Sequence, residues 1–196
     1  MTPHLKRSGL ICAAFLILLV SEARAVSDGF PSGKTLSGDH FSVVLASGID
    51  EGSLVARLGI GPQHRILSGR SVTGLTFSGK DLPVLLDAFF VWACDILDMQ
   101  LYSYKGTIKV AANGTQLKDV YRRLYGKESF SDKGFYVSET NTIYIAAGDF
   151  TKEILGHEIG HVIVGNYFVV QPPAKVHEVL AGYIEYQIRK LDRRDP

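Results

Sequence analysis

The sequence is poor in cysteine, has almost no excess of charge of either sign, and lacks an apolar run long enough to cross a membrane. Its 196 residues include two cysteines, Cys12 and Cys94, and its formal net charge is +1. The longest apolar run, residues 10–20, has eleven residues, whereas a membrane-spanning helix needs about 20. A disulfide-rich scaffold, a basic nucleic-acid-binding surface and a membrane-spanning helix are therefore not expected. Cys94 lies in an apolar helical stretch and is expected to be a buried thiol.

Residues 1–25 are typical of a secretory signal peptide. Lys6 and Arg7 precede the apolar run, and the triplet Ala-Arg-Ala at 23–25 has the small residues that a signal peptidase accepts. We expect cleavage after Ala25 and a secreted or periplasmic protein with no stable membrane span. Three cations and one anion leave with the peptide, so the net charge becomes −1. An uncleaved N-terminal anchor is the alternative.

The remaining residues predict one α+β domain at 39–196, preceded by a flexible, Gly/Ser-rich lead-in at 26–38. Strands are expected at 40–46 and 107–112, and as two strands joined near Thr140 and Asn141 within 134–147, with short β-like runs at 65–67 and 72–77. Helices are expected at 50–59, 81–100, 115–126, 151–165 and 175–191. The helix at 81–100 is apolar nearly all round and is expected to be buried, with Asp81 as its cap. Asp149 or Thr151 is expected to cap the helix at 151–165.

The stretch EILGHEIGHVIVGNYF at 153–168 contains the pattern HExxH. On a helix, His157 and His161 lie one turn apart on the same face, so both imidazoles can reach one zinc ion. Glu158 lies about 100° around the helix, beside the metal, where its carboxylate can take a proton from the water that zinc activates. This spacing predicts a catalytic zinc site, which requires a third protein ligand.

Several residues are candidates for the third ligand. The pattern in which a histidine follows at position 167 is excluded, because Val164 and Tyr167 stand where a glycine and that histidine would be. A glutamate on the next helix is the other common solution, and Glu178 is placed to supply it. Glu185, almost on the same helical face, is either the ligand instead or a residue that orients a histidine. His177 is the third candidate.

The segments HEIGH and PPAKVHEVLAGYIEY resemble the gluzincin zinc metallopeptidases, especially the small exported bacterial proteins of the peptidase-MA type. The resemblance implies that His157, His161 and Glu178 are the metal ligands and that Glu158 is the catalytic base. It also implies a single zincin-like domain with a small mixed sheet, a buried backing helix at 81–99, an HExxH helix and a C-terminal glutamate helix.

The sequence departs from that family in two places. Gly182 stands where the thermolysin-like pattern has an aspartate that supports a histidine, which leaves Glu185 or Asp149 for this role. Only KLDRRDP follows the glutamate helix, so we expect loops of this domain, or a partner, to select the substrate.

Tyr186 is a candidate donor to the oxyanion of the reaction. The segment TIYIAA at 142–147 would pair with an extended peptide as an edge strand; otherwise it is an interior strand.

These patterns predict an exported zinc metallopeptidase that hydrolyses peptide bonds of a peptide or protein substrate, with Zn2+ as its cofactor and no nucleic-acid partner. The alternative is a non-catalytic zinc-binding envelope protein that uses the zincin fold as a binding or assembly module.

Overall fold

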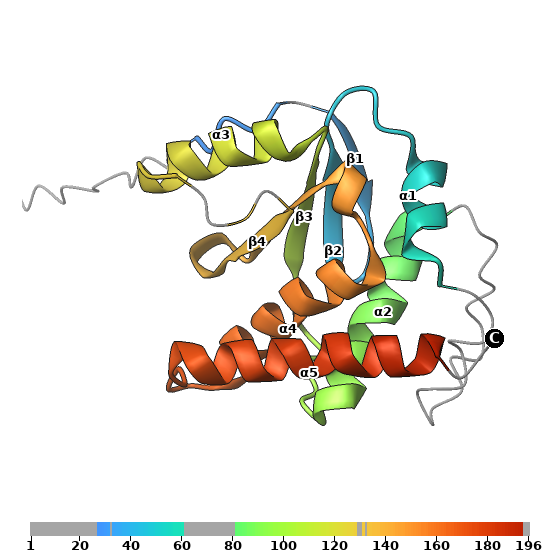
Figure 1. Cartoon of the computed structure of the whole chain (residues 1–196), viewed down its shortest axis with the longest axis vertical. Coiled ribbons are helices and arrows are strands. Elements are labelled where there is room, and N and C mark those ends of the chain that lie inside the picture. Colours follow the sequence, from blue (N-terminus) through green and yellow to red (C-terminus); the bar gives the residue numbers. More distant parts are fainter. Residues whose placement is uncertain (1–26, 32, 61–80, 129–130, 132, 194–196) are drawn as a thin grey trace, which may run out of the picture.

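The computed structural model describes residues 27–31, 33–60, 81–128, 131 and 133–193. Within them, a mixed five-stranded sheet and five α-helices form an α+β domain (Figure 1), which confirms the predicted fold class. The predicted signal peptide at 1–25 and the β-like runs predicted at 65–67 and 72–77 lie outside the described residues. In the described part of the chain, no helix has both the length and the apolar character needed to cross a bilayer.

The sheet has the strand order β1-β2-β3-β5-β4. Its strands are β1 (Lys34–Ser37), β2 (Phe41–Leu45), β3 (Gly106–Ala111), β4 (Gly134–Val137) and β5 (Thr142–Ala146). The three central strands run parallel, and β1 and β4 pair antiparallel with their neighbours. The segment TIYIAA, considered as an edge strand, therefore supplies the interior strand β5. Among the described residues, β1 and β4 are the edge strands, and β4 is the one next to β5.

The lead-in predicted at 26–38 contains the strand β1, so this part of the segment belongs to the sheet. Lys34 pairs with Leu45, and Ser37 pairs with Ser42. Gly33 lies directly against β2, since a Cβ there would be 1.7 Å from the carbonyl oxygen of Leu45. Glycine is required at that point because the backbone passes so close to β2. Earlier in the segment, Asp28 accepts a hydrogen bond from Tyr144 at 2.6 Å.

Helices cover both faces of the sheet. They are α1 (Glu51–Leu58), α2 (Leu82–Leu97), α3 (Gly114–Tyr125), α4 (Lys152–Tyr167) and α5 (Ala174–Asp192), with short 3-10 turns at Ser138–Thr140 and Ala147–Asp149. The helix α3 packs on one face through Leu117 and Val120. The other four helices share the larger core on the opposite face, and α5 lies against α4 (Figure 1).

The helix α2 is buried, as predicted from its apolar composition. Phe90 and Ala93 are almost inaccessible, and the Cys94 thiol is buried and free. Asp81 occupies the N-cap position, as predicted, but its side chain makes no capping hydrogen bond. The Glu51 carboxylate accepts a hydrogen bond from the backbone N–H of Leu82 at 3.3 Å instead.

The helix α4 begins after Thr151, whose side chain accepts a hydrogen bond from the Ile154 N–H, so the second of the two predicted caps is the one used. The helix extends beyond its predicted end at residue 165. Asn166 Nδ2 donates to the carbonyl of Val162 at 2.9 Å, and Gln171 Nε2 donates to the carbonyl of Gly165 at 2.9 Å. These side chains satisfy carbonyl groups at the end of the helix, which allows it to continue through Gly165.

Two glycines of α4 determine how closely α5 approaches it. A Cβ at Gly160 would lie 2.6 Å from the Cα of Ala181, and a Cβ at Gly156 would lie 2.4 Å from Ile188 Cδ1. Both separations are shorter than carbon atoms tolerate. The two glycines, one turn apart, therefore form the surface of α4 on which α5 packs.

We expect Gly160→Ala to destabilise the protein by about 1–3 kcal/mol, because the new methyl group overlaps backbone atoms that cannot rotate away. Urea denaturation followed by circular dichroism measures the effect. Gly182→Ala is the matched control, because a Cβ there meets nothing within 4 Å and alanine favours a helix. Equal stability of wild type and Gly160→Ala would show that α5 is free to move away from α4.

Candidate metal centre

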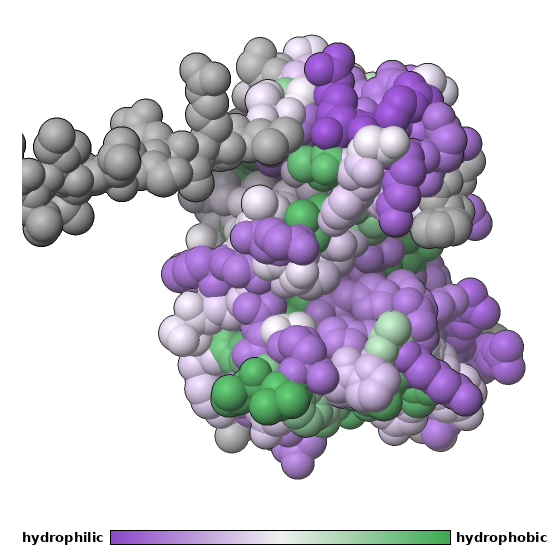
Figure 2. Space-filling view, turned by 90° about the vertical axis from the view of Figure 1, so that its left-hand side faces the viewer, coloured by the Kyte–Doolittle hydropathy of each residue, from purple (hydrophilic) through white to green (hydrophobic). Residues whose placement is uncertain are grey.

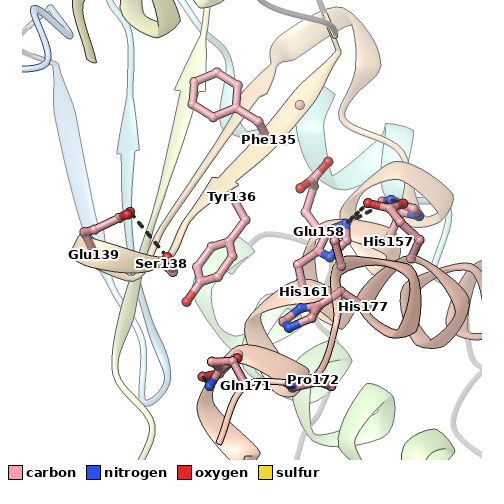
Figure 3. A pocket seen from close by; sticks show the side chains of 14 residues that line it. Phe135, Tyr136, Ser138, Glu139, His157, Glu158, His161, Gln171, Pro172 and His177 are labelled. Carbon is pink, nitrogen blue, oxygen red and sulfur yellow. Dashed lines mark hydrogen bonds and ion pairs between the residues drawn. The ribbon is translucent and has the colours of Figure 1, made fainter. Parts of the chain in front are cut away.

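His157 and His161 project from α4 toward the same point, as the HExxH spacing predicts. Their Nε2 atoms are 3.2 Å apart, and their rings are nearly perpendicular at an interplanar angle of 83°. Figure 3 shows both side chains at one side of a cavity. The two nitrogens thus lie as close together as two ligands of a single ion do.

Glu178 reaches the same point from α5. Its Oε2 is 3.6 Å from His157 Nε2, and its Oε1 is 3.7 Å from His161 Nε2. Ligands placed tetrahedrally at about 2.0–2.1 Å from zinc lie about 3.3 Å apart, so the three separations fit one zinc ion. Of the described residues, these three form the group of potential metal ligands whose donor atoms all lie within 4.8 Å of one another.

The other two candidates for third ligand are placed differently. The ring centre of His177 is 6.2 Å from that of His161, and His177 does not belong to the three-residue group. Glu185 lies behind the site, where its Oε2 is 3.6 Å from His157 Nδ1. That nitrogen is buried without a hydrogen-bond partner, and Glu185 bonds to Arg189 through its other oxygen. Glu185 is therefore the carboxylate placed to orient His157, whereas no ion pair joins Asp149 to either histidine among the described residues.

Glu158 is buried, with 7% of its surface exposed, and it faces the edge strand β4. A Cβ at Gly134 of that strand would lie 3.4 Å from Glu158 Oε1, so the strand passes within van der Waals distance of the carboxylate. Burial, and then the charge of Glu178, raises the pKa of Glu158 to about 8. Burial, and then His157, lowers the pKa of His161 to about 4, which keeps this imidazole neutral, as a metal ligand must be.

A cavity of about 780 Å³ lies between β4 and the histidine helix. The lining comes from β4 and the turn after it, from α4, and from the start of α5 with the loop before it (Figure 3): Gly134, Phe135, Tyr136, Ser138, Glu139, His157, Glu158, His161, Gly165, Gln171, Pro172, Ala174, His177 and Glu178. Tyr186 does not line this cavity and is 57% exposed on α5. It is therefore not placed to donate a hydrogen bond into the cavity, contrary to the prediction.

Sequence reasoning missed the contribution of β4. Tyr136 lies two residues after Gly134 and so on the same face of the strand, which is the alternation that a strand pattern would have indicated. Its hydroxyl donates to Asn141 Oδ1 at 2.8 Å, and Asn166 Nδ2 of α4 donates to the Tyr136 hydroxyl at 3.1 Å. These bonds tie the rim of the cavity to the end of the histidine helix.

Comparisons of the chain with known protein families, curated proteins and solved structures find no match.

We expect Glu158→Gln to stabilise the metal-free protein at high pH and to have little effect in acid. The pKa of Glu158 is raised from its ordinary value near 4.5 to about 8, so its contribution to stability is fully present below about pH 4.5 and is lost as the pH rises toward about 8. Glutamine cannot ionise, so the variant should be more stable than wild type by roughly 1–3 kcal/mol near pH 8. Urea denaturation with a chelator present measures this difference, with Glu139→Gln as the control at an exposed carboxylate. A difference that is the same at both ends of the pH range would contradict the burial of an ionisable Glu158.

Proposed function

We propose that the protein is an exported zinc metallopeptidase with a zincin-like domain, similar to the gluzincins. The observation that carries the proposal is the convergence of His157, His161 and Glu178 at separations of 3.2–3.7 Å, with the buried Glu158 following His157 directly in the same helix. A purely structural metal site has no need of a buried carboxylate next to its ligands. The arrangement therefore supports catalysis rather than metal storage or scaffolding.

Bound zinc would polarise a peptide carbonyl and lower the pKa of a water molecule. Glu158 accepts a proton from the attacking water, whose oxygen bonds to the carbonyl carbon, and then passes the proton to the leaving nitrogen as the C–N bond breaks. Glu185 holds the orientation of His157 from behind the site. These roles match the burial of Glu158 and the 3.6 Å approach of Glu185 to His157 Nδ1.

The edge strand β4 supports a peptide as the substrate. Its outer edge carries backbone N–H and C=O groups that no strand among the described residues pairs, and Gly134, Phe135 and Tyr136 line the cavity. An extended peptide that added to this edge would run along the cavity beside Glu158. Main-chain recognition of this kind suits hydrolysis of a peptide bond.

Glu158→Gln should retain one zinc ion per chain and lose peptide hydrolysis by at least about a hundredfold, because the proton acceptor is removed while the ligands remain. Digestion of a peptide library, together with elemental analysis of the purified protein, measures both properties. Glu153→Gln, in the first turn of the same helix, is the matched control and should cleave like wild type. Hydrolysis by Glu158→Gln at the wild-type rate would contradict the mechanism. Stoichiometric zinc without hydrolysis by wild type would favour the alternative, a non-catalytic zinc-binding envelope protein.

Glu178→Ala should lose most of its zinc on dialysis, because two histidines alone hold the ion weakly. His177→Ala, which changes the preceding residue, should retain the wild-type content. Glu185→Ala should retain the site with an affinity about 10–100-fold lower, as expected of a residue that orients a ligand. Metal titration with a fluorescent competitor measures all three. Wild-type affinity in Glu178→Ala would mean that the third ligand is another residue.

A further inference from the structure

The helix α5 exposes an apolar stripe that the domain does not use for packing. Val176, Val179, Tyr183 and Tyr186 are 39%, 61%, 44% and 57% exposed. Their spacing of three, four and three residues places them along one side of the helix, and the rings of the two tyrosines stack 6.5 Å apart. The buried residues of α5 lie on its other side, so folding alone does not account for this stripe.

The loop that leads into α5 exposes two further apolar side chains. Val169 is fully exposed and Val170 is 83% exposed. The loop is held in place, because Gln171 Nε2 donates to the carbonyls of Gly165 and Phe168 at 2.9 and 2.8 Å. It lies at the left-hand end of α5 in Figure 1, and the face seen from that side carries an apolar patch in its lower part (Figure 2).

Charge is distributed unequally around α5. Its three acidic residues, Glu178, Glu185 and Asp192, follow one another at intervals of seven and so lie on one side of the helix. That side faces α4, because Glu178 and Glu185 approach His157 and Asp192 forms an ion pair with Lys152 at 2.6 Å.

The cations of α5 lie outside that acidic row. Lys175 and Lys190 are exposed at the two ends of the apolar stripe, and neither has an ion-pair partner among the described residues. Arg189, also exposed, bonds to Glu185. The outer side of the helix therefore combines apolar side chains with positive charge.

We propose that this outer side of α5, together with the valines of the preceding loop, docks on an anionic lipid surface. The two lysines complement negatively charged headgroups, and tyrosines favour the boundary between headgroups and acyl chains. Val169 and Val170 would enter that boundary. Because Gln171 and Pro172 of the same loop line the cavity, docking holds the cavity next to the lipid surface. This inference rests on observations independent of the proposed chemistry.

A second copy of the chain fits the stripe less well. The stripe runs over eleven residues of helix, a length of about 15 Å. Its four side chains offer less area than the roughly 800 Å² that each partner of a stable dimer buries. An antiparallel copy of α5 would place Lys175 opposite Lys190, and a parallel copy would place each lysine beside itself. Both arrangements bring like charges together, whereas an anionic bilayer opposes both lysines with negative charge.

Flotation of the purified protein with vesicles tests the proposal. Vesicles of phosphatidylcholine alone are compared with vesicles that also contain phosphatidylglycerol. All variants share the rest of the chain, so any vesicle binding by another segment is the same in each and cancels when the variants are compared. We expect binding to the anionic vesicles that weakens with salt. It should fall at least about tenfold in Lys175→Glu/Lys190→Glu and in Val169→Asp/Val170→Asp, because charge attraction and apolar burial both contribute. Val179→Asp/Tyr183→Asp should show the same loss.

Two substitutions at other exposed positions serve as matched controls. Tyr102→Asp changes a tyrosine that is 73% exposed in the loop before β3, and Lys127→Glu reverses an exposed cation beyond α3. Both should bind vesicles like wild type, and circular dichroism should show all variants folded. Absence of flotation with anionic vesicles, or equal flotation of every variant, would overturn the proposal. So would a dimer mass by light scattering that Val179→Asp/Tyr183→Asp converts to a monomer, because the stripe would then be a subunit interface.

Discussion

The close packing of α5 on Gly156 and Gly160 is the constraint on which the candidate site depends. Each glycine directly precedes a histidine of the HExxH pattern, so the surface that touches α5 and the surface that carries the imidazoles are adjacent on α4. The approach of the two helices therefore sets how far Glu178 lies from the two nitrogens. Metal sites tolerate deviations of only about 0.2 Å in ligand distance. A packing contact between backbone atoms is a more reliable spacer at this scale than flexible side chains are.

Burial of α4 explains the electrostatics of the candidate site. Leu155, Ile159 and Val162 fill the core between α4 and the rest of the domain, and this packing draws Glu158 out of solvent. Burial and the charge of Glu178 both raise the pKa of Glu158. Ionisation of Glu158 would therefore place a second negative charge near Glu178 at a poorly solvated position. A divalent cation reverses the sign of that interaction and favours the ionised carboxylate that a general base requires. The same groups that destabilise one another in the empty protein thus become compatible around an ion.

The sequence predicted the features that lie within a single helix and left open those that depend on contacts between elements distant in sequence. Helical periodicity was enough to place His157 and His161 on one face, and the apolar composition of α2 was enough to bury it. Periodicity could not choose among His177, Glu178 and Glu185, because that choice depends on where α5 crosses α4. Whether residues 142–147 form an edge strand or an interior strand was left open for a similar reason, since strand order is fixed by pairing between β3 and β5, which are distant in sequence. Where short-range signals failed outright, as at the predicted helix end near Gly165, side chains from elsewhere supplied the missing hydrogen bonds.

The helix α5 combines three separate requirements, and its sequence shows how they are kept apart. Ala181, Ile184 and Ile188 are buried and hold it to the domain, the acidic row directs carboxylates toward α4, and the apolar stripe with its lysines remains outside. A helix has room for these three faces because residues seven apart return to nearly the same direction. Folding constrains the first face and the proposed metal site would constrain the second, but neither explains the third. Exposed valines and tyrosines cost solubility without stabilising the fold. Their alignment with Lys175 and Lys190, which have no ion-pair partner in the described part of the chain, is best explained by a surface that they contact.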